Sequence, residues 1–93
     1  MTHEPAPPAN PRLAEGLEIH EQADGYVVYQ SAREKVHFLN HTAVFLLELC
    51  NGEHSLEEIR RIYADAFDLP APPEEEIRST LETFVAEGLV LMP

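Results

Sequence analysis

The first half of the chain carries short stretches in which apolar and polar residues alternate, a spacing typical of half-buried strands. Residues 17–21 alternate in this way, and residues 26–30 are rich in the strand formers Tyr and Val. Asp24-Gly25 between them is a tight-turn signal. A third alternating stretch, residues 35–39, follows a second turn. Because the connections are short, the pattern predicts an antiparallel meander of three strands.

The second half carries apolar residues at helical spacing. Asn40 can cap a first helix over residues 42–50, which is apolar nearly all round and therefore belongs in the centre of the domain. Ser55 and Glu58 form the capping box of a second helix, in which charged residues separate the apolar positions. The proline-rich run 69–73 predicts a loop before a third helix.

The third helix is predicted to end near Gly88. It opens with three glutamates at residues 74–76, where the helix dipole favours negative charge. Residues 89–91 could form a closing strand or a packed tail, and the pattern leaves both open. This order of elements predicts an α+β fold of winged-helix type, with a three-stranded antiparallel sheet followed by three helices. The expected inner face of the third helix carries Ile77, Leu81, Phe84, Val85 and Gly88.

Composition divides the chain into a tail and one domain. Residues 1–12 contain four prolines and almost nothing apolar to bury, which predicts an extended or disordered tail. Residues 13–93 are expected to form the folded domain. The N-terminus has neither a basic region nor an apolar run, and no apolar stretch approaches the ~20 residues of a membrane span. We therefore expect a soluble protein of the cytoplasm.

The charge balance limits the partners that the protein can have. Seventeen acidic against six basic residues give a formal net charge of −11 at pH 7, which repels phosphate backbones and anionic lipids. Neither nucleic acid nor membrane is therefore an expected partner. A single cysteine excludes an internal disulfide and leaves no second thiolate for a Cys-rich zinc site.

The sequence offers no set of residues for catalysis or for a metal ion, so we expect no enzyme activity and no cofactor. Cys50 lies in an apolar helix without a neighbouring base, which favours a buried structural thiol. His41 and Cys50 stand at opposite ends of that helix, about 13 Å apart, so they cannot share a zinc ion with His37. The acidic runs occupy first turns of helices, where capping and dipole effects explain them.

Three stretches together resemble the PqqD family, which is named for pyrroloquinoline quinone biosynthesis. They are residues 36–43 (VHFLNHTA), residues 46–52 (LLELCNG) and residues 55–59 (SLEEI), and their order and spacing carry the resemblance over nearly the whole predicted domain. The chain departs from the family pattern at His41, where the family often has proline, and at Asn51, where it often has aspartate. Both residues suit the ends of a helix.

The resemblance implies a non-catalytic peptide chaperone, also called a RiPP recognition element. Such a domain binds the leader of a ribosomally made precursor peptide and presents it to a modifying enzyme, commonly a radical S-adenosylmethionine (SAM) enzyme. The expected partners are therefore a precursor peptide and such an enzyme, with the chain acting as a monomer or weak homodimer. The alternative is a winged-helix DNA-binding regulator, which only Arg60 and Arg61 on the second helix support locally.

The expected peptide site is the strand over residues 35–39. A meander leaves its outer strands unpaired, and such an edge can accept a peptide as an added strand, with the third helix flanking it. Alternation suggests that Val36 and Phe38 point into the core, while Lys35, His37 and the strand backbone contact the peptide. The candidate peptide-binding residues are Lys35, Val36, His37, Phe38, Leu39, Ile77, Arg78, Leu81 and Val85.

Overall fold

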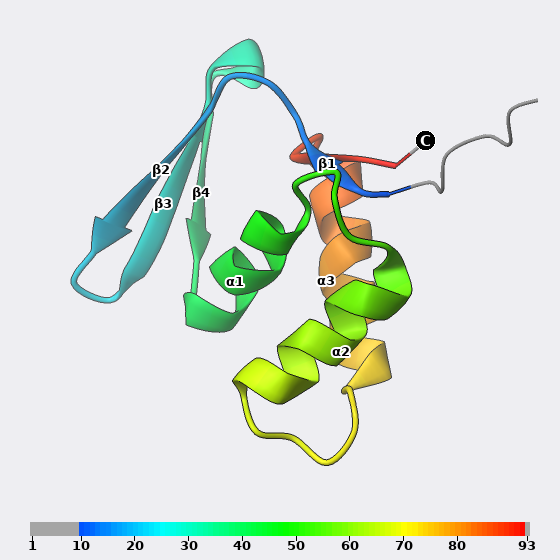
Figure 1. Cartoon of the computed structure of the whole chain (residues 1–93). Coiled ribbons are helices and arrows are strands. Elements are labelled where there is room, and N and C mark those ends of the chain that lie inside the picture. Colours follow the sequence, from blue (N-terminus) through cyan, green and yellow to red (C-terminus); the bar gives the residue numbers. More distant parts are fainter. Residues whose placement is uncertain (1–9, 93) are drawn as a thin grey trace, which may run out of the picture.

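The computed structural model describes residues 10–92 and confirms the α+β fold, in which a three-stranded antiparallel sheet precedes three helices (Figure 1). The strands of this sheet follow the order β2-β3-β4 and are β2 (Leu17–Gln22), β3 (Gly25–Gln30) and β4 (Lys35–Leu39). The helices are α1 (His41–Leu49), α2 (Leu56–Ala66) and α3 (Glu74–Ala86). Within the described range, no helix is long and apolar enough to cross a membrane.

Two tight turns fix the register of the sheet. At the β2–β3 turn, Gly25 has a φ of 144°, a conformation that residues with a Cβ rarely adopt. A Cβ on Gly25 would lie 2.7 Å from the carbonyl oxygen of Leu39, so this glycine also lets the end of β4 approach. A 3-10 turn over Ser31–Arg33 joins β3 to β4. In the resulting register, Val28 lies opposite His37.

The helices begin at the predicted caps. The side-chain oxygen of Asn40 accepts a hydrogen bond from the backbone N–H of Ala43, 2.9 Å away, at the start of α1. Ser55 and Glu58 form the capping box of α2, in which each side chain accepts from the backbone N–H of the other residue. Each cap satisfies backbone donors that the first turn of a helix leaves without an internal partner.

Two short strands close the domain at its ends. β1 (Arg12–Leu13) pairs antiparallel with β5 (Val90–Leu91), so the C-terminal segment does form a strand. Of the tail expected over residues 1–12, the first nine residues lie outside the described part of the chain. The last three belong to the fold: Asn10 donates a hydrogen bond to the loop after α1, Pro11 is buried and Arg12 opens β1. Proline content alone could not show this packing, which involves distant residues.

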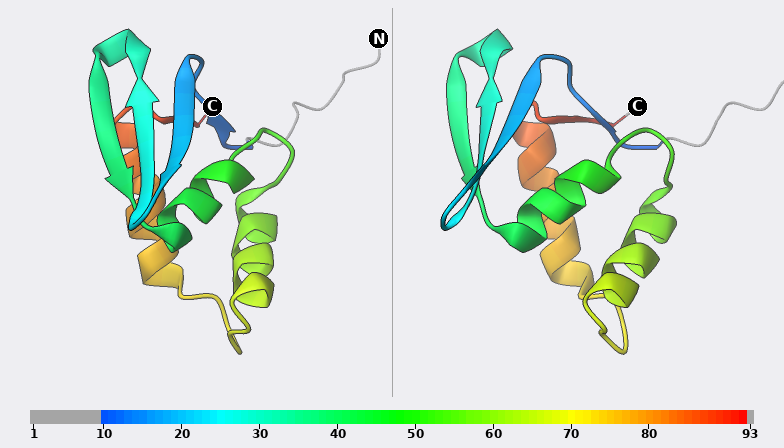
Figure 2. Two further views of the ribbon diagram at one scale, coloured as in Figure 1. Left: turned by 90° about the vertical axis from the view of Figure 1, so that its left-hand side faces the viewer. Right: turned by 60° about the vertical axis from the view of Figure 1, so that its left-hand side comes forward.

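The core lies between the helices and one face of the sheet. All three helices stand on the same side of the sheet, so no described helix covers its other face (Figure 2). The predicted central helix α1 contacts β3, β4, α2 and α3, as its apolar surface led us to expect. The side chains that are almost fully buried in this core include Val28, Leu46, Leu47, Ile59, Ile77, Phe84 and Leu89.

Candidate functional site

β4 forms an unpaired edge of the sheet. It pairs with β3 on one side, and no described strand pairs with it on the other. Backbone N–H and C=O groups along the unpaired side can therefore bond to another strand. α3 stands on the helical side of the sheet (Figures 1 and 2), and its C-terminal end comes close to β4, where Glu87 lies 3.7 Å from Lys35. The structure thus contains the edge that the predicted meander implies, with the end of a helix near it.

The side chains of β4 face opposite to the expected direction. Val36 is 50% exposed and Phe38 is 80% exposed, so the prediction that they point into the core is wrong. The inward positions belong to His37, which lies opposite the fully buried Val28, and to Leu39, which packs against the core. Alternation defines two faces of a strand but not which of them meets the core, and the apolar character of Val36 and Phe38 indicated the wrong one.

A buried glutamine connects β4 to the end of α3. Gln30 is only 3% exposed, and its Nε2 donates to the carbonyl oxygens of Glu87 (3.0 Å) and Gly88 (3.2 Å). Its Oε1 lies 2.9 Å from Nε2 of His37. Because an amide oxygen can only accept, His37 donates from Nε2. This network holds the imidazole in one orientation at the β4 edge.

An ion pair adds a second link between β4 and α3. The Lys35 ammonium lies 3.7 Å from the Glu87 carboxylate. Both side chains are well exposed, so the pair contributes at most ~1 kcal/mol to stability. Helical spacing places Thr83, Thr80 and Glu76 on the same side of α3 as Glu87. The side of α3 in line with Glu87 is therefore polar.

The residues of α3 that were expected to flank β4 lie on other sides of this helix. Ile77 belongs to the core and is 1% exposed. Arg78, Leu81 and Val85 line a hollow of about 340 Å³ between α2 and α3, which Met92 borders. Val85 was expected on the inner face of the helix but is 41% exposed, because it turns toward this hollow. The structure therefore separates these residues from β4, on another side of α3.

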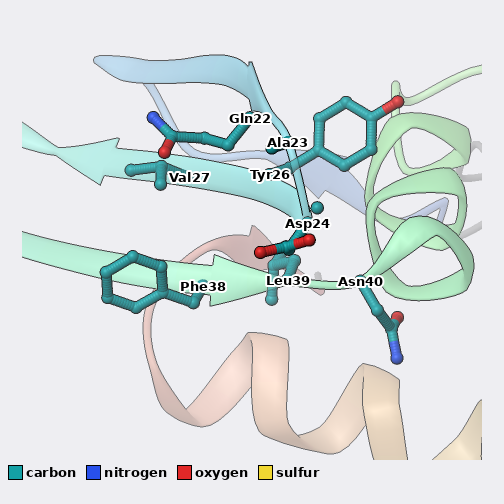
Figure 3. A pocket seen from close by; sticks show the side chains of 9 residues that line it. Gln22, Ala23, Asp24, Tyr26, Val27, Phe38, Leu39 and Asn40 are labelled. Atoms are coloured by element: carbon teal, nitrogen blue, oxygen red, sulfur yellow. The ribbon is translucent and has the colours of Figure 1, made fainter.

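Another hollow, of about 410 Å³, lies where the β2–β3 turn meets the end of β4 (Figure 3). Val27 and Phe38, on neighbouring strands, line it from the face of the sheet that the helices leave uncovered. Asp24 adds a carboxylate from the turn. The sequence reasoning did not identify this hollow, because it assigned Phe38 to the core.

The single cysteine is a structural residue. Cys50 is fully buried, and its Sγ donates to the carbonyl oxygen of Leu46 at 3.3 Å. Burial raises the pKa of the Cys50 thiol to about 12, so the nucleophilic thiolate is scarce at neutral pH. The prediction of a buried thiol is confirmed. In the part of the chain that the structure describes, no three His, Cys, Asp or Glu residues are grouped so that they could hold a metal ion.

Comparison with known proteins decides the family. The family described as "Coenzyme PQQ synthesis protein D (PqqD)" matches residues 25–90, from β3 to β5. The chain belongs to the PqqD family. It is 32% identical over 76 residues to the "PqqA binding protein" of Rhizobium meliloti (strain 1021), and the aligned region is 82% of this chain and 74% of that relative. No solved structure gives a significant match.

The two departures from the PqqD sequence pattern fit the structure. His41 opens α1, and its ring contacts Tyr26 edge-on, with 5.4 Å between the ring centroids. The side-chain oxygen of Asn51 accepts a hydrogen bond from the backbone N–H of Glu53, 2.9 Å away, in the loop after α1. Both residues thus have local structural roles in this member of the PqqD family, and the edge at β4 lies within the matched region.

Proposed function

We propose that this protein binds a ribosomally made precursor peptide as an added strand on β4 and presents it to a modifying enzyme. The observation that carries the proposal is the unpaired β4 edge, which Gln30 connects to the end of α3. Membership of the PqqD family and the similarity to a protein named for PqqA binding support a PqqA-type leader peptide, as in pyrroloquinoline quinone biosynthesis. The modifying enzyme is a radical SAM enzyme of the cytoplasm, and this domain contributes binding rather than catalysis.

The β4 edge divides the side chains of an added strand between two environments. Alternate side chains point toward α3, near His37 and Leu39, and the others lie beside Val36 and Phe38 on the open face. β4 has only five residues, so its few backbone hydrogen bonds, at ~1 kcal/mol net each, supply part of the affinity. Burial of two or three peptide side chains, at ~1.5–3 kcal/mol each, supplies the rest and the selectivity.

A DNA-binding role agrees poorly with the charges. α3 would be the recognition helix of a winged-helix regulator, yet its one basic residue, Arg78, is bonded to Glu75 and Glu82. On α2, Arg60 pairs with Glu74 at 3.2 Å. The net charge of −11 also opposes the release of counterions that drives binding to duplex DNA. Peptide binding is therefore the function that we propose.

Two variants distinguish the β4 edge from the hollow between α2 and α3. His37→Ala changes the edge, and Val85→Thr changes the hollow with little change of volume. In calorimetric titrations with synthetic PqqA peptide, we expect about tenfold weaker binding to H37A, a loss of roughly 1.4 kcal/mol, and an unchanged affinity for V85T. Circular dichroism of both variants controls for folding.

The opposite pattern of affinities would place the peptide between α2 and α3 and contradict the proposed site. If the wild-type protein binds no PqqA peptide at high micromolar concentration, the proposed ligand itself is wrong.

A further inference from the structure

The uncovered face of the sheet carries a cluster of exposed apolar side chains. In this face Tyr29 lies opposite Val36, and Val27 lies opposite Phe38. Tyr29 is 37% exposed, Val36 50% and Phe38 80%. The hollow at the β2–β3 turn adjoins the cluster through Val27 and Phe38. We name this surface the outer face and define it by Glu18, His20, Val27, Tyr29, Val36 and Phe38.

The outer face and the adjoining hollow carry two carboxylates. Glu18 stands beside Tyr29 and lies 3.2 Å from Nε2 of His20, and Asp24 contributes its carboxylate to the hollow. None of the six Lys and Arg residues belongs to the outer face, although all six lie within the described chain. Two of them, in or next to β4, turn toward α3: Lys35 approaches Glu87, and Arg33 lies against Gly88. The others lie on β1, α2 and α3, as Arg12, Arg60, Arg61 and Arg78.

The outer face is continuous with the β4 edge. An added strand would lie ~4.8 Å beyond β4, and its outward side chains would stand about 5 Å from those of Val36 and Phe38. Two cross-strand rows would each gain one side chain from the peptide: the row of Glu18, Tyr29 and Val36, and the row of His20, Val27 and Phe38. A bound peptide therefore extends the outer face by one strand.

We propose that a partner protein docks on the outer face and reads it together with the outward side chains of the bound peptide. This inference rests on the proposed function, and the partner is the modifying enzyme, presenting an apolar surface bordered by Lys or Arg. Charge complementarity favours such a partner, since the face is apolar with Glu18 and Asp24 near it. A second copy of this chain is disfavoured, because each copy has a net charge of −11 and would bring the same carboxylates together.

The test measures binding of the enzyme and of the peptide separately. The probes are synthetic PqqA peptide and the purified radical SAM enzyme that is encoded together with that PqqA. The variant Tyr29→Thr replaces an exposed ring of the outer face on β3, one strand away from the β4 edge, by a β-branched residue that favours strands. Leu69→Thr, at another exposed apolar residue in the α2–α3 loop, is the matched control. Circular dichroism shows which variants are folded, and Glu18→Lys on β2 replaces Y29T if that variant does not fold.

We expect Y29T to bind the peptide with nearly wild-type affinity and to bind the enzyme about tenfold more weakly, with the larger loss when peptide is present. L69T should bind the enzyme as the wild type does. Glu18→Lys should bind the enzyme more weakly than the wild type, because it reverses a charge of the outer face. Unchanged enzyme affinity of Y29T and E18K would overturn the inference. Wild-type dimers that Y29T converts to monomers would overturn it as well, in favour of self-association. Failure of the wild-type protein to bind PqqA peptide would instead contradict the proposed function.

Discussion

Two polar residues, Gln30 and His37, link β4 to the end of α3 by hydrogen bonds. Both face inward on neighbouring strands, and each finds a partner there. Gln30 has the same strand parity as the buried Val28, so its inward direction is readable from the sequence. Its bonds to carbonyl groups 57 and 58 residues later are not, because periodicity carries no information on such distant contacts.

Replacing Gln30 tests this network. Gln30→Met keeps a similar volume but leaves the carbonyl groups of Glu87 and Gly88 and the Nε2–H of His37 without their partner. We expect a loss of about 1–3 kcal/mol in the free energy of unfolding, because each of these partly buried groups loses its hydrogen bond. Urea denaturation measures the loss, and a midpoint equal to that of the wild type would show that the network does not stabilise the fold.

The burial of Cys50 predicts how its reactivity depends on folding and pH. The folded pKa is raised to about 12 from 9.0, so the stability that the neutral thiol contributes is full below pH 9 and is lost as the pH rises from 9 toward 12. At pH 8 we expect alkylation by iodoacetamide to be slower by about 100-fold or more in the native protein than in urea. Similar rates in the two states would mean that the thiol is accessible and ionisable in the fold.

The three helices and the strands β2, β3 and β4 were predictable as elements, because their signals are local. The caps at Asn40 and Ser55, the Asp24-Gly25 turn and the alternation over residues 35–39 each depend on residues close in sequence. The direction in which β4 faces was not predictable from alternation, because Val36 and Phe38 form the more apolar of its two faces and yet lie exposed. Which side chains of β4 face the helices follows from the same direction.

The capping box of α2 gives an element-scale prediction. Ser55→Ala removes the side-chain oxygen that accepts from the N–H of Glu58, so we expect a loss of about 1 kcal/mol in unfolding free energy. Ser79→Ala, at an exposed position inside α3, is the matched control and should be neutral or slightly stabilising, because alanine favours helices. Thermal denaturation of both variants measures the difference. Equal midpoints for S55A and S79A would contradict the contribution of the cap.

At the scale of the whole molecule, one sheet serves two purposes. Its inner face packs on the three helices and forms the core, while its outer face and β4 edge stay open. The acidic charge of the chain could be read from composition and argues against phosphate-bearing partners. The location of the apolar surface could not, because composition does not reveal which apolar side chains remain exposed.

The most direct test of the central claim is to detect the added strand itself by NMR. With isotope-labelled protein and unlabelled PqqA peptide, a strand on β4 predicts intermolecular backbone NOEs to residues 35–39 and slowed amide exchange along that edge. Chemical-shift changes should extend to the side of α3 that carries Thr83 and Glu87. NOEs from the peptide to α2 or to Val85, with none to residues 35–39, would contradict strand addition.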